Sequence, residues 1–130
     1  MVFLGLAIFC LNFSSTVTLA SDSDIKIKSA SAESEFPEGI RFSVQAISSS
    51  RISEIAVNFR IGQQVSGVYE YLDFEDGLEV NGSLFWKTNT SPKYVPPGTI
   101  IEYSFSISDE SGNTFDSENK YLVYSDTRFE

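Results

Sequence analysis

The chain has 130 residues, of which 42% are hydrophobic, and its 18 acidic and 9 basic residues give a formal net charge of −9. This length fits one domain, and the negative charge disfavours binding to nucleic acid or to anionic lipid surfaces. Histidine, the usual general base and commonest metal ligand, is absent, and the single cysteine, Cys10, leaves no disulfide to stabilise the fold.

Residues 1–20 have the features of a secretory signal peptide. They carry no charge, an apolar run covers residues 2–11, and Thr18 and Ala20 suit a small-residue cleavage site. The run is shorter than the ~20 apolar residues that a membrane-spanning helix needs. We therefore expect residues 1–20 to be a signal peptide and residues 21–130 to form one exported domain, extracellular or at the cell surface. Membrane contact is expected only through the signal segment, if it is retained.

Alternation of apolar and polar residues predicts the first three strands. Residues 25–28 alternate isoleucine with lysine, which is typical of a charged edge strand. A turn at residues 36–39 leads into a strand over residues 40–47, with its even positions inward. A loop is expected at residues 48–51, and the next strand, at residues 55–61, places its odd positions inward.

Two further strands are predicted around an acidic loop at residues 73–77. Residues 65–72 place Val65, Tyr69 and Tyr71 on one face. The inward residues of the strand over 78–86 are expected to be Leu78, Val80, Leu84 and Trp86. Gly82 interrupts this strand, which indicates a bulge or a close approach by a neighbour.

The strongest strand signal lies in residues 94–109, where a proline-glycine corner precedes an alternating run. Its inward residues are Ile101, Tyr103, Phe105 and Ile107. A hairpin turn at residues 109–113 and strands around Phe115 and residues 121–124 follow. No helical period occurs after the signal segment. The predicted fold is all-β: an immunoglobulin-like antiparallel β-sandwich of about seven strands.

Two acidic clusters are candidate calcium sites, because calcium takes several oxygen ligands from loops. The clusters comprise Asp73, Glu75 and Asp76 in one loop, and Asp109, Glu110, Asn113 and Asp116 in the other. Turns favour aspartate and asparagine for backbone reasons, so we assign neither cluster to a metal. Catalysis by paired carboxylates is disfavoured because they fall in solvent-facing loops or on outer strand faces. We predict no enzyme activity, no cofactor, and no catalytic, cofactor-binding or metal-binding residues.

Several aromatic residues could form a stacking surface for a sugar ring or a peptide: Tyr69, Tyr71, Phe74, Phe85, Trp86 and Tyr94. Trp86 and Phe59 have inward positions, so Phe74 and Phe85 are expected to face outward. The triplets at residues 81–83 and 89–91 match the N-glycosylation pattern, which matters if the host glycosylates.

The segment VPPGT at residues 95–99 resembles fibronectin type III and related immunoglobulin-like modules, in which such a corner precedes a strand with a structural tyrosine. Three longer blocks are FPEGIRFSVQA at residues 36–46, YVPPGTIIEYSFSISDESGNT at 94–114, and YLVYSDTRFE at 121–130. Together they are similar to the N-terminal sandwich domain of exported bacterial peptidase MA-like zinc metallohydrolases. In that family a D-x-R-F segment, here residues 126–129, precedes the peptidase domain. No H-E-x-x-H occurs here, so no zinc ligand or catalytic glutamate is transferred.

This resemblance implies a non-catalytic accessory domain that positions a downstream metallopeptidase domain absent from this chain. The alternative is a free-standing cell-surface module that binds a glycan or a protein through the region of Phe74 and Phe85. A third hypothesis is a small enzyme that uses loop carboxylates. The expected partners are accordingly a C-terminal peptidase domain or another surface protein, without nucleic acid.

Overall fold

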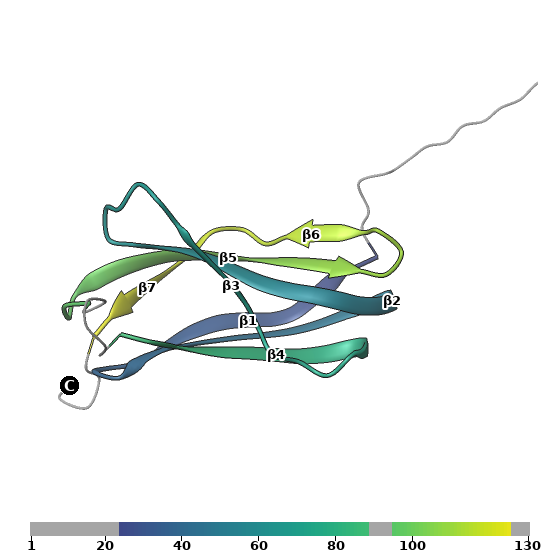
Figure 1. Ribbon diagram of the computed structural model, residues 1–130, viewed down its shortest axis with the longest axis horizontal. Coiled ribbons are helices and arrows are strands. Elements are labelled where there is room, and N and C mark those ends of the chain that lie inside the picture. The colour runs from purple at the N-terminus through teal and green to yellow at the C-terminus, as the bar shows by residue number, and fades with distance from the viewer. Residues whose placement is uncertain (1–23, 89–94, 126–130) are drawn as a thin grey trace, which may run out of the picture.

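The computed structural model describes residues 24–88 and 95–125, which form a two-layered all-β molecule (Figure 1). Its strands are β1 (Lys26–Glu35), β2 (Gly39–Ile61), β3 (Val68–Tyr71), β4 (Gly77–Lys87), β5 (Thr99–Asp109), β6 (Thr114–Asp116) and β7 (Lys120–Tyr124). All strand pairs are antiparallel. The described residues contain no helix, and so none that is long and apolar enough to cross a membrane. The predicted signal peptide, Tyr94, the triplet at residues 89–91 and the segment 126–129 lie outside the described residues.

Strand β2 belongs to both layers. Its first half, up to Ile47, pairs with β1 and β4. Its second half pairs with β3 and β5, and Ile52, where that half begins, also lies opposite Gly77 of β4. The predicted loop at residues 48–51 is wrong, because these residues continue the strand while it changes partners. The serines there break the apolar alternation, but Ser48 is buried and its hydroxyl donates a hydrogen bond to Asp109 Oδ2 at 2.8 Å. A strand that switches sheets commonly bends or bulges at the crossing.

We call β1, the first half of β2 and β4 layer A, and β3, the second half of β2, β5, β6 and β7 layer B. The core lies between the layers and is made of these buried side chains: Ile25, Ile40, Phe42, Val44, Ala46, Ile52, Ile55, Val57, Phe59, Leu72, Val80, Trp86, Val95, Ile101, Tyr103, Phe105, Ile107 and Tyr124. The inward faces predicted for residues 40–47 and for Ile101, Tyr103, Phe105 and Ile107 are confirmed. The predicted β-sandwich of about seven strands is likewise confirmed.

Aromatic rings join the two layers at the centre of the core. Phe59 from layer B contacts Trp86 and Phe42 from layer A, each at 4.9 Å between ring centroids. The centroid of Tyr103 lies 5.6 Å from that of Phe42. Burial of such large rings stabilises the sandwich, since each removes about 150–250 Å² from water.

Strand β1 is longer than predicted and contains a bulge between Ile27 and Ser29. The bulge reverses the alternation, so Ile27 and then Ala30 both pack on the core. Two small alanines give a weak apolar signal, which explains why only residues 25–28 were predicted as strand. In the described residues β1 pairs with β2 alone, as expected of an edge strand.

Strands β3 and β4 differ from the prediction at their ends. Strand β3 begins only at Val68, and Val65 lies in the preceding turn with 94% of its surface exposed. Leu78 is also exposed, because it lies at the start of β4, next to the acidic loop. The close approach predicted at Gly82 is confirmed: a Cβ there would lie 3.1 Å from Ile55 Cδ1.

Candidate functional site

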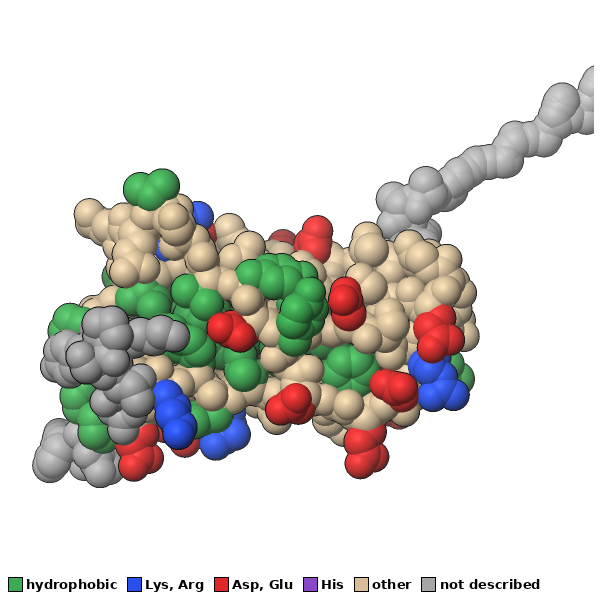
Figure 2. All heavy atoms as spheres, in the orientation of Figure 1, with side chains coloured by type: hydrophobic (Ala, Val, Ile, Leu, Met, Phe, Trp, Pro, Cys, Tyr) green, Lys and Arg blue, Asp and Glu red, His purple; other side chains and the backbone are tan. Residues whose placement is uncertain are grey.

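A pair of exposed tyrosines lies on the outer face of layer B. Tyr69 and Tyr71 are 52% and 57% exposed, and their rings meet edge to face with centroids 5.5 Å apart. Alternate residues of a strand share a face, so the short strand β3 holds both rings on the same side. Figure 2 shows a hydrophobic patch over β3 with acidic side chains around it. We call this surface the tyrosine face.

Short side chains form the floor of the tyrosine face. Tyr71 lies opposite Ala56 on β2, and Ala56 in turn lies opposite Ser106 on β5. Ala56 belongs to the outward side of the strand and is nevertheless only 1% exposed. The edge-to-face contact between the two rings limits their freedom before any ligand binds.

Carboxylates lie beside the aromatic pair. Partial burial raises the pKa of the Tyr69 hydroxyl, and the nearby Tyr71, Glu54 and Asp116 raise it further. Tyr69 is therefore an uncharged hydrogen-bonding group at neutral pH. Asp116 is oriented by the hydroxyl of Ser106, which donates to Asp116 Oδ1 at 2.7 Å. The patch thus combines apolar rings with acceptors for hydroxyl or amide protons.

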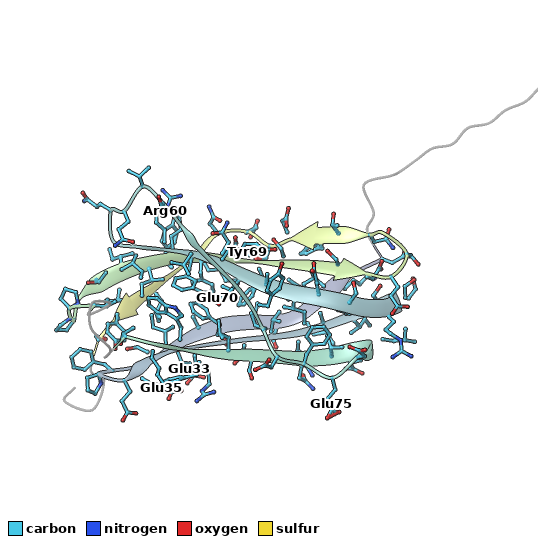
Figure 3. All side chains as sticks on the ribbon, in the orientation of Figure 1. Glu33, Glu35, Arg60, Tyr69, Glu70 and Glu75 are labelled. Carbon is cyan, nitrogen blue, oxygen red and sulfur yellow. The ribbon has the colours of Figure 1, made fainter. Side chains whose placement is uncertain are left out.

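A polar hollow of about 150 Å³ opens next to Tyr69 on the same face. Figure 3 shows Tyr69 near the middle of the molecule and Arg60 closer to the end where β2 leads into β3. The hollow is lined by Asn58, Phe59, Arg60, Gly67, Glu102, Tyr103, Ser104 and Asn119.

Glu102 organises one wall of the polar hollow. Its Oε2 accepts hydrogen bonds from Asn119 Nδ2 at 3.0 Å and from the Tyr121 hydroxyl at 3.3 Å. Its Oε1 lies 3.7 Å from a guanidinium nitrogen of Arg60. These contacts hold the Glu102 carboxylate in place, and the positive charge of Arg60 largely balances its negative charge.

The predicted acidic cluster at residues 73–76 surrounds a separate, open hollow of about 570 Å³, which is also lined by Glu79 and Asn81. The part of the chain that the structure describes holds no group of three or more acidic, cysteine or histidine side chains placed to bind a metal. The structure therefore gives no geometric support for calcium in this loop.

The second predicted acidic cluster is not gathered into one site. Asp109 is 5% exposed, and its Oδ1 accepts hydrogen bonds from the backbone N–H groups of Ser111 and Asn113, both at 3.0 Å. Its Oδ2 accepts from Asn113 Nδ2 and from Ser48. Asp116 lies instead on β6, where it pairs with Ser106. The carboxylate of Asp109 thus organises the turn between β5 and β6 and fastens it to β2.

The environment of Asp109 favours its charged form. Burial alone would raise the pKa of this carboxyl group, but hydrogen bonds from Asn113, Ser48 and Ser111 outweigh burial and lower the pKa below its ordinary value of 3.8. The group is therefore a stable anion whose lone pairs are occupied by its neighbours. It has no role that requires proton transfer near neutral pH.

The prediction that Phe74 faces outward is wrong, whereas Phe85 does lie on the outward side of its strand. Phe74 is half-buried and packs against the core, since the acidic loop folds its ring inward. Phe85 lies on the outer side of layer A, but the guanidinium of Arg41 covers its ring at 5.0 Å, and Glu35 holds Arg41 at 2.7 Å. The two phenylalanines therefore form no common binding surface.

Sequence reasoning placed Tyr69 and Tyr71 on one face but did not identify it as the exposed one. Val68 packs against the core and Leu72 is only 4% exposed. Both are at even positions, so they lie on the face of the strand opposite to the tyrosines. The apolar residues on that face were the sequence signal that could have identified the tyrosine side as the exposed one. It was weak because Glu70 interrupts it and because Val65 shares the parity of the tyrosines.

No family model matches the chain, and no curated protein matches it. The resemblance to peptidase MA-like proteins therefore stays a prediction. Two solved structures resemble parts of the fold. One, the bromine derivative of BhCBM56, is 12% identical, with 72% of this chain and 88% of that chain covered and a TM-score of 0.46. The other, a β-1,3-glucan binding domain of carbohydrate-binding module family 56, is 14% identical, with 77% and 99% covered and a TM-score of 0.43. At this level of similarity neither structure establishes a family for this chain.

Proposed function

We propose that this protein is a non-catalytic binding module whose tyrosine face binds an uncharged glycan. The observation that carries the proposal is the exposed edge-to-face pair of Tyr69 and Tyr71, fixed on a floor of short side chains. The C–H groups on one face of a sugar ring are apolar and pack well on aromatic rings, while the hydroxyl groups at its edge need hydrogen-bond partners. A binding site for such a ligand combines apolar contact with a few placed polar groups.

Charge favours an uncharged glycan over an anionic one. The chain has a net charge of −9, and Glu54 and Asp116 lie close enough to Tyr69 to raise its pKa. Carboxylates accept hydrogen bonds from sugar hydroxyls, whereas they repel uronates and sulfates. The same repulsion disfavours nucleic acid.

The size of the patch favours a glycan over a folded protein. Two tyrosines together offer at most about 500 Å², whereas a stable protein interface buries about 800 Å² on each partner. The surroundings of the patch are acidic and polar, although the fully buried centre of a protein interface is usually depleted of charge. Binding of a glycan outside the cell is consistent with the export predicted from residues 1–20.

Affinity gel electrophoresis of the full chain tests the proposal. The gels contain uncharged polysaccharides (mixed-linkage β-glucan, xylan, galactomannan) or anionic ones (alginate, heparin). We expect retardation by at least one uncharged polymer and none by the anionic polymers. Tyr69→Ala and Tyr71→Ala should each weaken binding about fivefold to thirtyfold, because truncation of an aromatic anchor costs about 1–2 kcal/mol.

Phe85→Ala, on the outer side of layer A, serves as the matched control and should bind like the wild type. Thermal unfolding of each variant verifies that it is folded. The proposal is wrong if no uncharged polymer retards the protein. It is also wrong if both folded tyrosine variants bind like the wild type.

A further inference from the structure

The polar hollow continues the tyrosine face along β2. Asn58 and Arg60 are successive outward residues of this strand; Asn58 lies opposite Tyr69 on one side and Ser104 on the other. Arg60 lies opposite Glu102. Since a strand rises about 3.3 Å per residue, the Arg60 end of the hollow lies about 7 Å beyond the row that contains Tyr69. A glycan chain that leaves the tyrosines along β2 therefore enters the hollow.

The chemistry of the hollow suits hydroxyl groups. Glu102 is held by Asn119 and Tyr121, and it lies beside Arg60, so the charged groups are largely compensated. Within residues 24–88 and 95–125, the carboxamide of Asn58 and the hydroxyl of Ser104 have no side-chain hydrogen-bond partner, and both line the hollow. Fixed donors and acceptors without a net charge match the edge of an uncharged sugar better than a phosphate or a carboxylate.

Gly67 keeps the hollow open on the side of β3. A Cβ at this position would lie 2.8 Å from Asn58 Oδ1 and 3.3 Å from the backbone oxygen of Phe59. Any larger residue would therefore push the Asn58 carboxamide out of its place. The absence of a side chain at Gly67 gives Asn58 the room in which its amide can face a ligand.

We infer that the polar hollow is a second sugar subsite, which receives the hydroxyl edge of the residue next to the one stacked on the tyrosines. The inference rests on the proposed function and specifies how the ligand is oriented: the glycan lies along β2. Its recognition then needs at least two sugar residues. The tyrosines supply apolar contact that most sugars can make, and Asn58 and Ser104 discriminate between arrangements of hydroxyl groups.

Isothermal titration of the full chain with oligosaccharides of each uncharged polysaccharide that retards it, one to six residues long, tests the inference. In at least one series the affinity should rise steeply between the monosaccharide and the trisaccharide. Asn58→Ala should weaken hexasaccharide binding about threefold to tenfold, the loss of one or two hydrogen bonds. Gly67→Ala should weaken it similarly, and neither variant should change monosaccharide binding. Gln45→Ala, in layer A, is the control.

The outcomes separate the subsite from the function. If Tyr69→Ala weakens hexasaccharide binding but Asn58→Ala and Gly67→Ala bind like Gln45→Ala, the second subsite is refuted and the glycan-binding function stands. If none of these variants weakens binding, both are refuted. Asn58 is exposed, so its variant is expected to fold, and thermal unfolding provides the check.

Discussion

Tyr103 lies at the centre of the core, where it is 5% exposed and its ring contacts those of Phe42 and Phe105. Burial raises the pKa of its hydroxyl, and a backbone hydrogen bond with Ala32 acts in the opposite direction. Ala32 belongs to β1 in layer A. A single side chain of β5 therefore contributes both apolar volume and a polar link between the layers.

Tyr103→Ala should lower the free energy of unfolding by about 3–5 kcal/mol, as truncations of large aromatic residues in cores do. Tyr103→Phe keeps the ring and should cost only about 1 kcal/mol, the net value of one hydrogen bond. Urea denaturation of both variants measures the difference. A loss below about 1 kcal/mol for the alanine variant would contradict the packing described for β5.

Asp109 should make stability depend on pH. Its folded-state pKa lies below the ordinary value of 3.8, so the stabilisation by its charged form is present above that value. It is lost as the pH falls through the folded pKa. Asp109→Asn should therefore be less stable than the wild type at pH 7, and the gap should shrink at pH values below 3.8. Glu110→Gln, an exposed neighbour, is the control, and a gap independent of pH would sink this explanation.

At the scale of the element, β2 holds the two layers together because one continuous strand pairs with four others. Gly39 begins this strand at a point of close approach between backbones. A Cβ there would lie 2.4 Å from the backbone oxygen of Trp86 and 2.7 Å from the ring of Phe85. Residue 39 therefore has to be glycine for β2 and β4 to pair at their ends.

Gly39→Ala should destabilise the protein by about 1–3 kcal/mol or more, because the extra methyl group forces the paired backbones apart. Gly77→Ala is the matched control in β4: its Cβ would meet atoms at 3.5 Å or more, which is ordinary contact. The control should be neutral or slightly stabilised by the reduced freedom of its unfolded chain. Equal effects of the two substitutions in chemical denaturation would argue against this description of Gly39.

The sequence predicts elements well where alternating apolar residues are large. Phe42, Phe59 and Phe105 indicate which face of each strand points inward, and all three are buried. The prediction fails at residues 48–51, because a strand that changes partners loses its alternation while its backbone continues. It fails at Phe74 because a loop can fold a side chain inward without any period in the sequence.

The candidate site was harder to predict than the fold. The polar hollow combines residues from β2, β5 and the segments before β3 and β7, and its register depends on strand pairing that no local pattern reveals. The sequence predicted only that Tyr69 and Tyr71 share one face of a strand. Which side of the sheet they occupy follows from Val68 and Leu72, whose contacts with the core appear only in the folded molecule.

At the scale of the whole molecule, the two outer faces differ in character. Layer A carries charged pairs on its surface, such as Lys28 with Glu79 and Arg41 with Glu35. Layer B has the pair of Arg60 with Glu102 and, in addition, the tyrosine face, with serine hydroxyls of β5 beside it. This difference supports the proposal that layer B is the binding side of the sandwich, and the net charge of −9 disfavours ligands with negative charge.

Binding of an uncharged glycan should be almost independent of ionic strength. Salt screens attraction between charges, and an uncharged ligand offers none to screen. The affinity for the polysaccharide that retards the protein in the gel should therefore change by less than about twofold between about 0.05 and about 0.5 M sodium chloride. A steep loss of affinity with salt would contradict a site that recognises its ligand without charge attraction.

The central claim is that layer B binds an uncharged glycan through the tyrosine face and the polar hollow. The most direct test is a titration of ¹⁵N-labelled full chain with the hexasaccharide of an uncharged polysaccharide that retards the protein, followed by amide chemical shifts. The account predicts shifts at residues 56–60, 67–71 and 102–106, with the outward residues of β1 and β4 unchanged. Shifts confined to β1 and β4, or no shifts with that hexasaccharide at millimolar concentration, would contradict it.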